Sequence, residues 1–213
     1  MKSLSVLIIA IFAFVLVSCG EKARELKNAM ELAKNAPEMA KNMEKSQNAA
    51  QAKIDERKKK GDTLAMPYQK LQQYLPTALA GYKAETPGGE SMNMPGMSYS
   101  NASIRFTKEN TPTPDNVTIE LLDYNQVGAM FTAATFWMSG YSREDAKGYE
   151  KTFNPGINNV FGFEKFEKER KYAELTYAIG YRFILTIKGY NQTDGEALKN
   201  IGKSMKLSEL AGM

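Results

Sequence analysis

Residues 172–190 have the sequence YAELTYAIGYRFILTIKGY, and this stretch decides the fold. Before Gly180, apolar residues fall at every second position: Ala173, Leu175, Tyr177 and Ile179. Alternation with a period of two is typical of a β-strand with one buried face, and glycine is a common turn residue. The stretch therefore predicts an antiparallel pair of strands, over residues 172–179 and 181–190, that turns at Gly180.

Further strands and helices are predicted around this pair. Strand-like segments occur at residues 82–86, 97–107, 117–124, 148–153 and 160–167. Apolar residues at helical spacing predict helices over 68–75 and 127–138, and a last helix that opens with a capping-box arrangement from Thr193 to Glu196. Short turns imply antiparallel pairing, so the fold class is α+β, with a largely antiparallel sheet covered by helices. This element order is similar to that of PsbP-like α/β sandwiches.

Residues 19–62 differ from the rest of the chain. From residue 20 to residue 60 there is no aromatic side chain, and Ala, Lys, Glu, Asn and Gln predominate, which favours helix. Pro37 is expected to interrupt or kink that helix. We predict a charged, partly helical stalk; because its apolar stripe is thin, a solvated stalk is favoured over a coiled coil that pairs two copies. The globular domain is then expected over residues 63–213, with almost no core from residues 20–60.

The N-terminus has the pattern of an export signal. Lys2 precedes an apolar run from Leu4 to Val17. This run is short for a transmembrane helix, which needs about 20 apolar residues, and it suits the central region of a secretory signal. The run ends in Leu16-Val17-Ser18-Cys19. These residues resemble the lipobox of bacterial lipoproteins.

The resemblance to bacterial lipoproteins implies a definite fate for the chain. In that family a diacylglycerol is attached to the cysteine thiol, the signal is cut before the cysteine, and the new amine is usually acylated. Residues 1–18 would then be the signal peptide and Cys19 the site of lipid attachment. In Gram-negative lipoproteins an aspartate directly after the cysteine retains the protein at the inner membrane, so Gly20 implies the outer membrane. The alternative is an uncleaved N-terminal anchor with a chance cysteine.

The composition limits the chemistry available to the chain. It has no histidine and one cysteine, Cys19, which lipid would occupy. Ser-His-Asp and Cys-His arrangements and the usual zinc sites are therefore excluded. Removal of residues 1–18 would lower the net charge from +4 to +3, because that segment carries Lys2 and no acid. So small a charge does not indicate a nucleic-acid partner. Five acids show no spacing that selects a catalytic pair: Glu85, Asp123, Glu164, Glu167 and Glu174.

Three methionines, Met92, Met94 and Met97, lie in a Gly- and Pro-containing stretch, residues 88–97, which we expect to be a loop. Thioether sulfur is a soft ligand that selects Cu(I), and the spacing resembles the methionine-rich motifs of periplasmic copper proteins. The alternative, which we favour, is that these side chains are flexible hydrophobes that fold the loop back onto the core.

These observations lead to three hypotheses. The first is a non-enzymatic envelope lipoprotein without a cofactor, anchored through Cys19, whose domain binds a protein partner or a small apolar ligand. The second is soft-metal binding through the methionines, and the third is an envelope enzyme built on carboxylates. A cleft lined by Tyr, Phe and Trp137 would favour a ligand, converging sulfur atoms a metal, and two facing buried carboxylates an enzyme.

Overall fold

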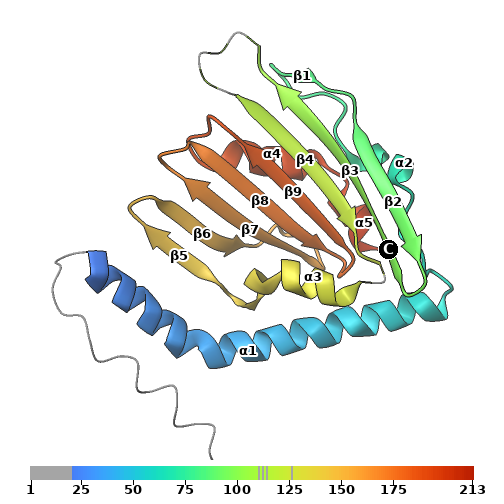
Figure 1. Cartoon of the computed structure of the whole chain (residues 1–213), viewed down its shortest axis with the longest axis horizontal. Coiled ribbons are helices and arrows are strands. Elements are labelled where there is room, and N and C mark those ends of the chain that lie inside the picture. Colours follow the sequence, from blue (N-terminus) through green and yellow to red (C-terminus); the bar gives the residue numbers. More distant parts are fainter. Residues whose placement is uncertain (1–20, 110, 112, 114, 126) are drawn as a thin grey trace, which may run out of the picture. The chain divides into compact units, whose positions relative to one another are not determined.

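A computed structural model describes residues 21–109, 111, 113, 115–125 and 127–213. Its largest element is one antiparallel sheet of nine strands (Figure 1). The strands are β1 (Lys83–Ala84), β2 (Gly88–Met94), β3 (Met97–Thr107), β4 (Asn116–Asp123), β5 (Ser142–Asp145), β6 (Gly148–Phe153), β7 (Val160–Glu167), β8 (Tyr172–Ile179) and β9 (Phe183–Gly189). Their order is β1-β3-β4-β9-β8-β7-β6-β5, and β2 pairs with β3 beside β1. The α+β fold with a largely antiparallel sheet is thus confirmed.

The inner face of the sheet carries the main core. Alternate residues of β3, β4, β8 and β9 are buried there, among them Phe106, Ile119, Leu175 and Leu185. Short helices supply the other side of this core: α2 (Tyr68–Leu71) with the 3-10 turn η1 (Gln72–Tyr74), α4 (Glu196–Ser204) and α5 (Leu207–Ala211). Figure 1 shows α4 and α5 behind the sheet. The buried side chains of α4 include Leu198 and Ile201, as the helical spacing predicts.

The outer face of the sheet has a smaller, aromatic core at one end. It is formed by α3 (Gly128–Ala134) and the 3-10 turn η2 (Phe136–Ser139). Phe131 and Trp137 from these turns pack with Ala178 of β8 and Ile184 of β9. Gly140 ends the segment with φ of 101°, the left-handed conformation expected of a glycine after a helix.

Helix α1 (Glu21–Lys59) contains Pro37 within its span. The chain divides into two compact units, Met1–Ala36 and Pro37–Met213. Within the second unit Ala50, Ile54 and Arg57 of α1 are buried. One face of α1 therefore packs against the part of the chain that was expected to begin at residue 63. No helix in the described ranges is long and apolar enough to cross a membrane.

Three local features correct the sequence-based expectations. Residues 88–94 form β2 instead of a loop, because each pairs with a residue of β3 across the turn at Pro95-Gly96. Strand β5 and helix α5 were not predicted. The predicted capping box at α4 does not form; the N-cap is Gly195, which has no side-chain cap, and Asp194 Oδ1 accepts from the backbone N–H of Glu196.

Candidate functional site

A pocket of about 490 Å³ opens between η2 and the adjoining ends of β6 and β7. Its lining consists of Trp137, Met138, Gly140, Thr152, Phe153, Asn154, Ile157, Asn158, Asn159, Val160, Phe161 and Gly162. None of these side chains is charged. Small-molecule sites are typically concave, of about 300–1,000 Å³, and mostly apolar with a few polar groups. This pocket, called the aromatic pocket below, has both properties.

Stacked aromatic rings hold one wall of the aromatic pocket in place. Trp137 is 3% exposed and stacks on Phe163 of β7, with ring centroids 5.3 Å apart and an interplanar angle of 21°. Phe161, two residues earlier on the same face of β7, is 37% exposed and meets Tyr181 edge-on at 5.9 Å. Such pairs add stabilisation beyond area burial. The wall is therefore preformed, and Phe161 is its accessible ring.

At the end of β6, which also lines the pocket, the ring of Phe153 packs on the inner face of the sheet. Its ring lies over Gly162 of β7 and meets Tyr177 edge-on at 5.5 Å. A Cβ at position 162 would lie 2.5, 2.6 and 2.7 Å from three carbons of the Phe153 ring. Only glycine lets the ring approach this closely, so Gly162 determines how the end of β6 packs on β7.

Asparagines supply the polar groups of the aromatic pocket. Asn154 Oδ1 accepts from the backbone N–H of Gly156, which shapes the turn. The carbonyl of Asn159, whose φ is 58°, accepts from the backbone N–H of Gly180. Asparagine tolerates this left-handed conformation better than most residues. The loop that closes the pocket is thus tied to the β8–β9 turn.

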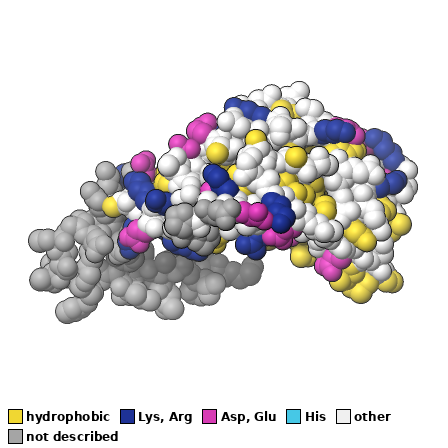
Figure 2. Space-filling view, turned by 90° about the horizontal axis from the view of Figure 1, so that it is seen from above, with side chains coloured by type: hydrophobic (Ala, Val, Ile, Leu, Met, Phe, Trp, Pro, Cys, Tyr) yellow, Lys and Arg dark blue, Asp and Glu magenta, His cyan; other side chains and the backbone are white. Residues whose placement is uncertain are grey.

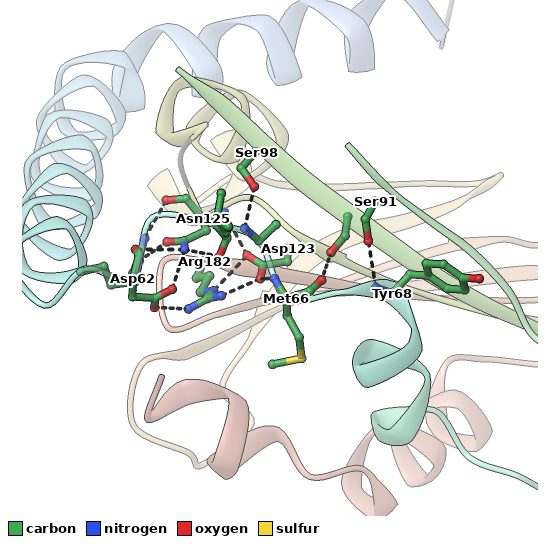
Figure 3. Close-up of polar contacts among 12 residues, drawn as sticks. Asp62, Met66, Tyr68, Ser91, Ser98, Asp123, Asn125 and Arg182 are labelled. Atoms are coloured by element: carbon green, nitrogen blue, oxygen red, sulfur yellow. Dashed lines mark hydrogen bonds and ion pairs between the residues drawn. The ribbon is translucent and has the colours of Figure 1, made fainter. Parts of the chain in front are cut away.

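A buried polar cluster lies where the segment after α1 meets the sheet (Figure 3). Arg182 donates from Nε and Nη2 to the two carboxylate oxygens of Asp123, over 2.9 and 2.8 Å, and from Nη1 to Asp62 over 2.6 Å. Burial acts to lower the pKa of Arg182, but the two carboxylates outweigh it and the pKa is raised. Asn125 donates to the carbonyls of Asp62 and Leu64.

The same cluster positions the chain from Ala65 to Tyr68. Backbone N–H groups of Ala65, Met66 and Tyr68 donate to Ser98 Oγ, Asp123 Oδ2 and Ser91 Oγ, respectively. The three acceptors belong to β3, β4 and β2, respectively (Figure 3). These hydrogen bonds fasten the segment to the sheet, which is a structural role.

Three carboxylates are buried in the described part of the chain, and each has its own partners. Asp123 binds Arg182, and Asp115 accepts from Tyr82 Oη. Glu164 forms an ion pair with Lys199 at 2.8 Å and accepts from Tyr149 Oη over 2.5 Å. Burial acts to lower the pKa of Lys199, but Glu164 and Glu196 outweigh it and the pKa is raised. Burial and the Glu164 carboxylate raise the pKa of Tyr149.

The three methionines share one face of the β2–β3 hairpin. Met94 is directly opposite Met97, and Met92 is opposite Tyr99. Met92 and Met94 are exposed and Met97 is half-buried. No group of three or more His, Cys, Asp or Glu residues in the described ranges could hold a metal ion.

Sequence reasoning named Trp137 as a lining residue, but not Phe153, Phe161 or the asparagine loop. The remaining predicted site residue, Cys19, lies outside the described residues. Comparison with protein-family models, curated proteins and solved structures finds no match for this chain. Figure 2 shows basic and acidic side chains interspersed on the visible face, without a patch of one sign.

Proposed function

We propose that this chain is a lipid-anchored envelope lipoprotein, without enzymatic activity, whose domain binds a small uncharged ligand of apolar or aromatic character. The observation that carries the proposal is the aromatic pocket, with its preformed rings and uncharged lining. An aromatic or alicyclic ring that lies on Phe161 would leave its polar substituents within the asparagine loop. A charged ligand would find no counter-ion among the lining residues.

The single tryptophan of the chain gives a direct assay for the pocket, because Trp137 lines it. We expect the neutral dye N-phenyl-1-naphthylamine to bind the full chain and to quench Trp137 emission. Phe161→Ala should weaken dye binding about tenfold, the size expected for the loss of one aromatic contact. Met130→Ala, at an exposed position of α3, serves as the control. Equal dye affinity in the Phe161 and Met130 variants would refute the pocket as the site.

The anchor is proposed from the lipobox-like residues Leu16 to Cys19 alone. Two or three acyl chains hold a protein stably on a membrane, whereas one chain binds only marginally. Metabolic labelling with a palmitate analogue should mark the wild type and not Cys19→Ala, which should accumulate as the unprocessed precursor. Equal labelling of both would disprove lipidation at Cys19. Density-gradient fractionation tests the outer-membrane location proposed from Gly20.

A further inference from the structure

The two edges of the sheet are built differently. Strand β5 at one edge has four residues, of which Arg143, Glu144 and Asp145 are charged. Short, charged edge strands resist pairing with other chains. Strand β2 at the other edge has seven residues, all exposed, and one charge, at Glu90. Figure 1 shows β2 as the outermost strand on its side, so this edge lacks the protection of β5.

The direction of the backbone groups in β2 follows from its neighbours. Arg105 O accepts from the N–H of Glu85, beside β1, so odd-numbered residues of β3 point their backbone groups toward this edge. In β2 the residues opposite them are the even-numbered ones, from Gly88 to Met94. The backbone groups of Gly89, Ser91 and Asn93 therefore point outward, and they have no partner within the described ranges.

We propose that β2 pairs antiparallel with β2 of a second copy of this chain, about a twofold axis at Ser91. The three outward residues are symmetric about that position. Ser91 would then exchange hydrogen bonds with Ser91 of the second copy, and Gly89 with Asn93. The two sheets would join into one, through an isologous contact that closes after two copies. This contact is independent of the aromatic pocket.

The side chains of β2 fit this register. Glu90 would lie opposite Met92 of the second copy and not opposite the second Glu90, so the two negative charges at the contact would not face each other. Glu90 is already held by Tyr99 Oη and Asn101 Nδ2 on the same face. Met92 is 37% exposed, and its flexible thioether can pack along the aliphatic part of a glutamate. Tyr68 of α2 packs on Gly89 from the inner face and Gln72 Nε2 donates to the carbonyl of Gly88, while all seven residues of β2 stay exposed.

The register predicts opposite effects from two substitutions at one position. Sedimentation velocity of the full chain in detergent should show a concentration-dependent dimer. Met92→Glu places a carboxylate opposite each of the two Glu90 side chains and should weaken the dimer about tenfold, whereas Met92→Lys should strengthen it by a similar factor. Met94→Glu, opposite Gly88 of the second copy, is the matched control and should change little. A monomer at all concentrations, or equal effects of Glu and Lys, would overturn the proposal.

A second measurement keeps the test independent of affinity. Positions 90 and 92 of facing copies would form a non-hydrogen-bonded pair, whose Cα atoms lie close enough for a disulfide. In a Cys19→Ser background, mixing the Glu90→Cys chain with the Met92→Cys chain should give a crosslinked dimer on mild oxidation. Each variant alone should crosslink much less. Crosslinking that is equal in the mixture and in the separate variants would contradict the register.

Discussion

Arg57 of α1 donates from Nε to Asn125 Oδ1, over 2.6 Å, across a separation of 68 residues. Its Nη2 also reaches the backbone carbonyls of Asn125 and Tyr181, at 3.4 and 3.5 Å. Burial lowers the pKa of Arg57, and the nearby Arg182 acts in the same direction. Two positively charged side chains, Arg57 and Arg182, are thus buried side by side. The hydrogen-bond acceptors and the carboxylates of the cluster offset the free-energy cost of burying them.

Replacement of Arg57 by methionine should destabilise the domain. The substitution keeps an unbranched side chain but leaves Asn125 Oδ1 without its donor, which costs about 1–3 kcal/mol for a buried group. Urea unfolding measures the free energy of unfolding. Lys58→Met, at the next and exposed position, is the control. A loss no greater than in that control would show that the contact is energetically neutral.

The start of the folded unit can be tested with two shortened chains. A chain from Pro37 retains Ala50, Ile54 and Arg57, whereas a chain from Thr63 loses them. Burial of an isoleucine side chain alone contributes about 1.5–3 kcal/mol. The chain from Pro37 should therefore melt cooperatively and at a higher temperature than the chain from Thr63. Equal melting temperatures would support the boundary at residue 63 that the sequence predicts.

Alkaline pH should weaken the contact between α4 and β7. The folded state holds the protons of Lys199 and Tyr149 more tightly than the unfolded state does, because both pKa values are raised. Their contribution is therefore complete below about pH 10, near the ordinary pKa of either side chain, and is lost as the pH rises above it. Lys199→Met should flatten the fall in unfolding free energy above pH 10. Lys203→Met, on the same helix but exposed, should leave the fall unchanged.

Gly162→Ala tests the close approach at the aromatic pocket. The new methyl group must displace the ring of Phe153, and overpacking of this kind costs about 1–3 kcal/mol. Gly88→Ala is a suitable control, since its nearest neighbour would be Ser103 Oγ at 3.7 Å. A normal melting curve for Gly162→Ala would mean that the ring moves at no cost.

Copper binding at the β2–β3 hairpin is expected to be weak. Met92, Met94 and Met97 share a face, but the chain has no histidine, and lipid would occupy its cysteine. Competition with a Cu(I) chelator should show no stoichiometric capture. Replacement of all three by alanine should change the melting temperature only modestly. Stoichiometric capture by the wild type that the triple variant loses would establish the metal hypothesis.

The strands whose bounds were predicted best are those with one face more buried than the other. Apolar and polar residues alternate over residues 97–107 and 172–179 because one face of the sheet is buried and the other is partly exposed. The bounds of these segments match β3 and β8. Strand β2 was missed because all seven of its residues are exposed, so they carry no alternation. Two of them are glycines, which are poor strand formers, and the strand exists through its pairing with β3.

The site was less predictable than the fold. Trp137 lies in a 3-10 turn, whereas Phe153 and Phe161 flank a loop on another hairpin, so only the tertiary fold brings them together. The packing of α1 on the domain is only weakly indicated by the sequence. Ala50 and Ile54 have helical spacing, but the third buried residue is Arg57, and a charged residue usually indicates a solvated face.

Strand β9 lies between β4 and β8, although it is the last strand of the chain. When residue 179 leaves the ribosome, eight strands exist, yet the two groups they form have no common neighbour. The middle of the sheet is completed only by residues 183–189, about 60 positions after β4 ends. The centre of the sheet therefore cannot pair before residues 183–189 are present, because its contacts are long-range ones that close late. Until those residues are present, β4 and β8 each have one edge without a neighbouring strand, and β9 then covers both edges at once.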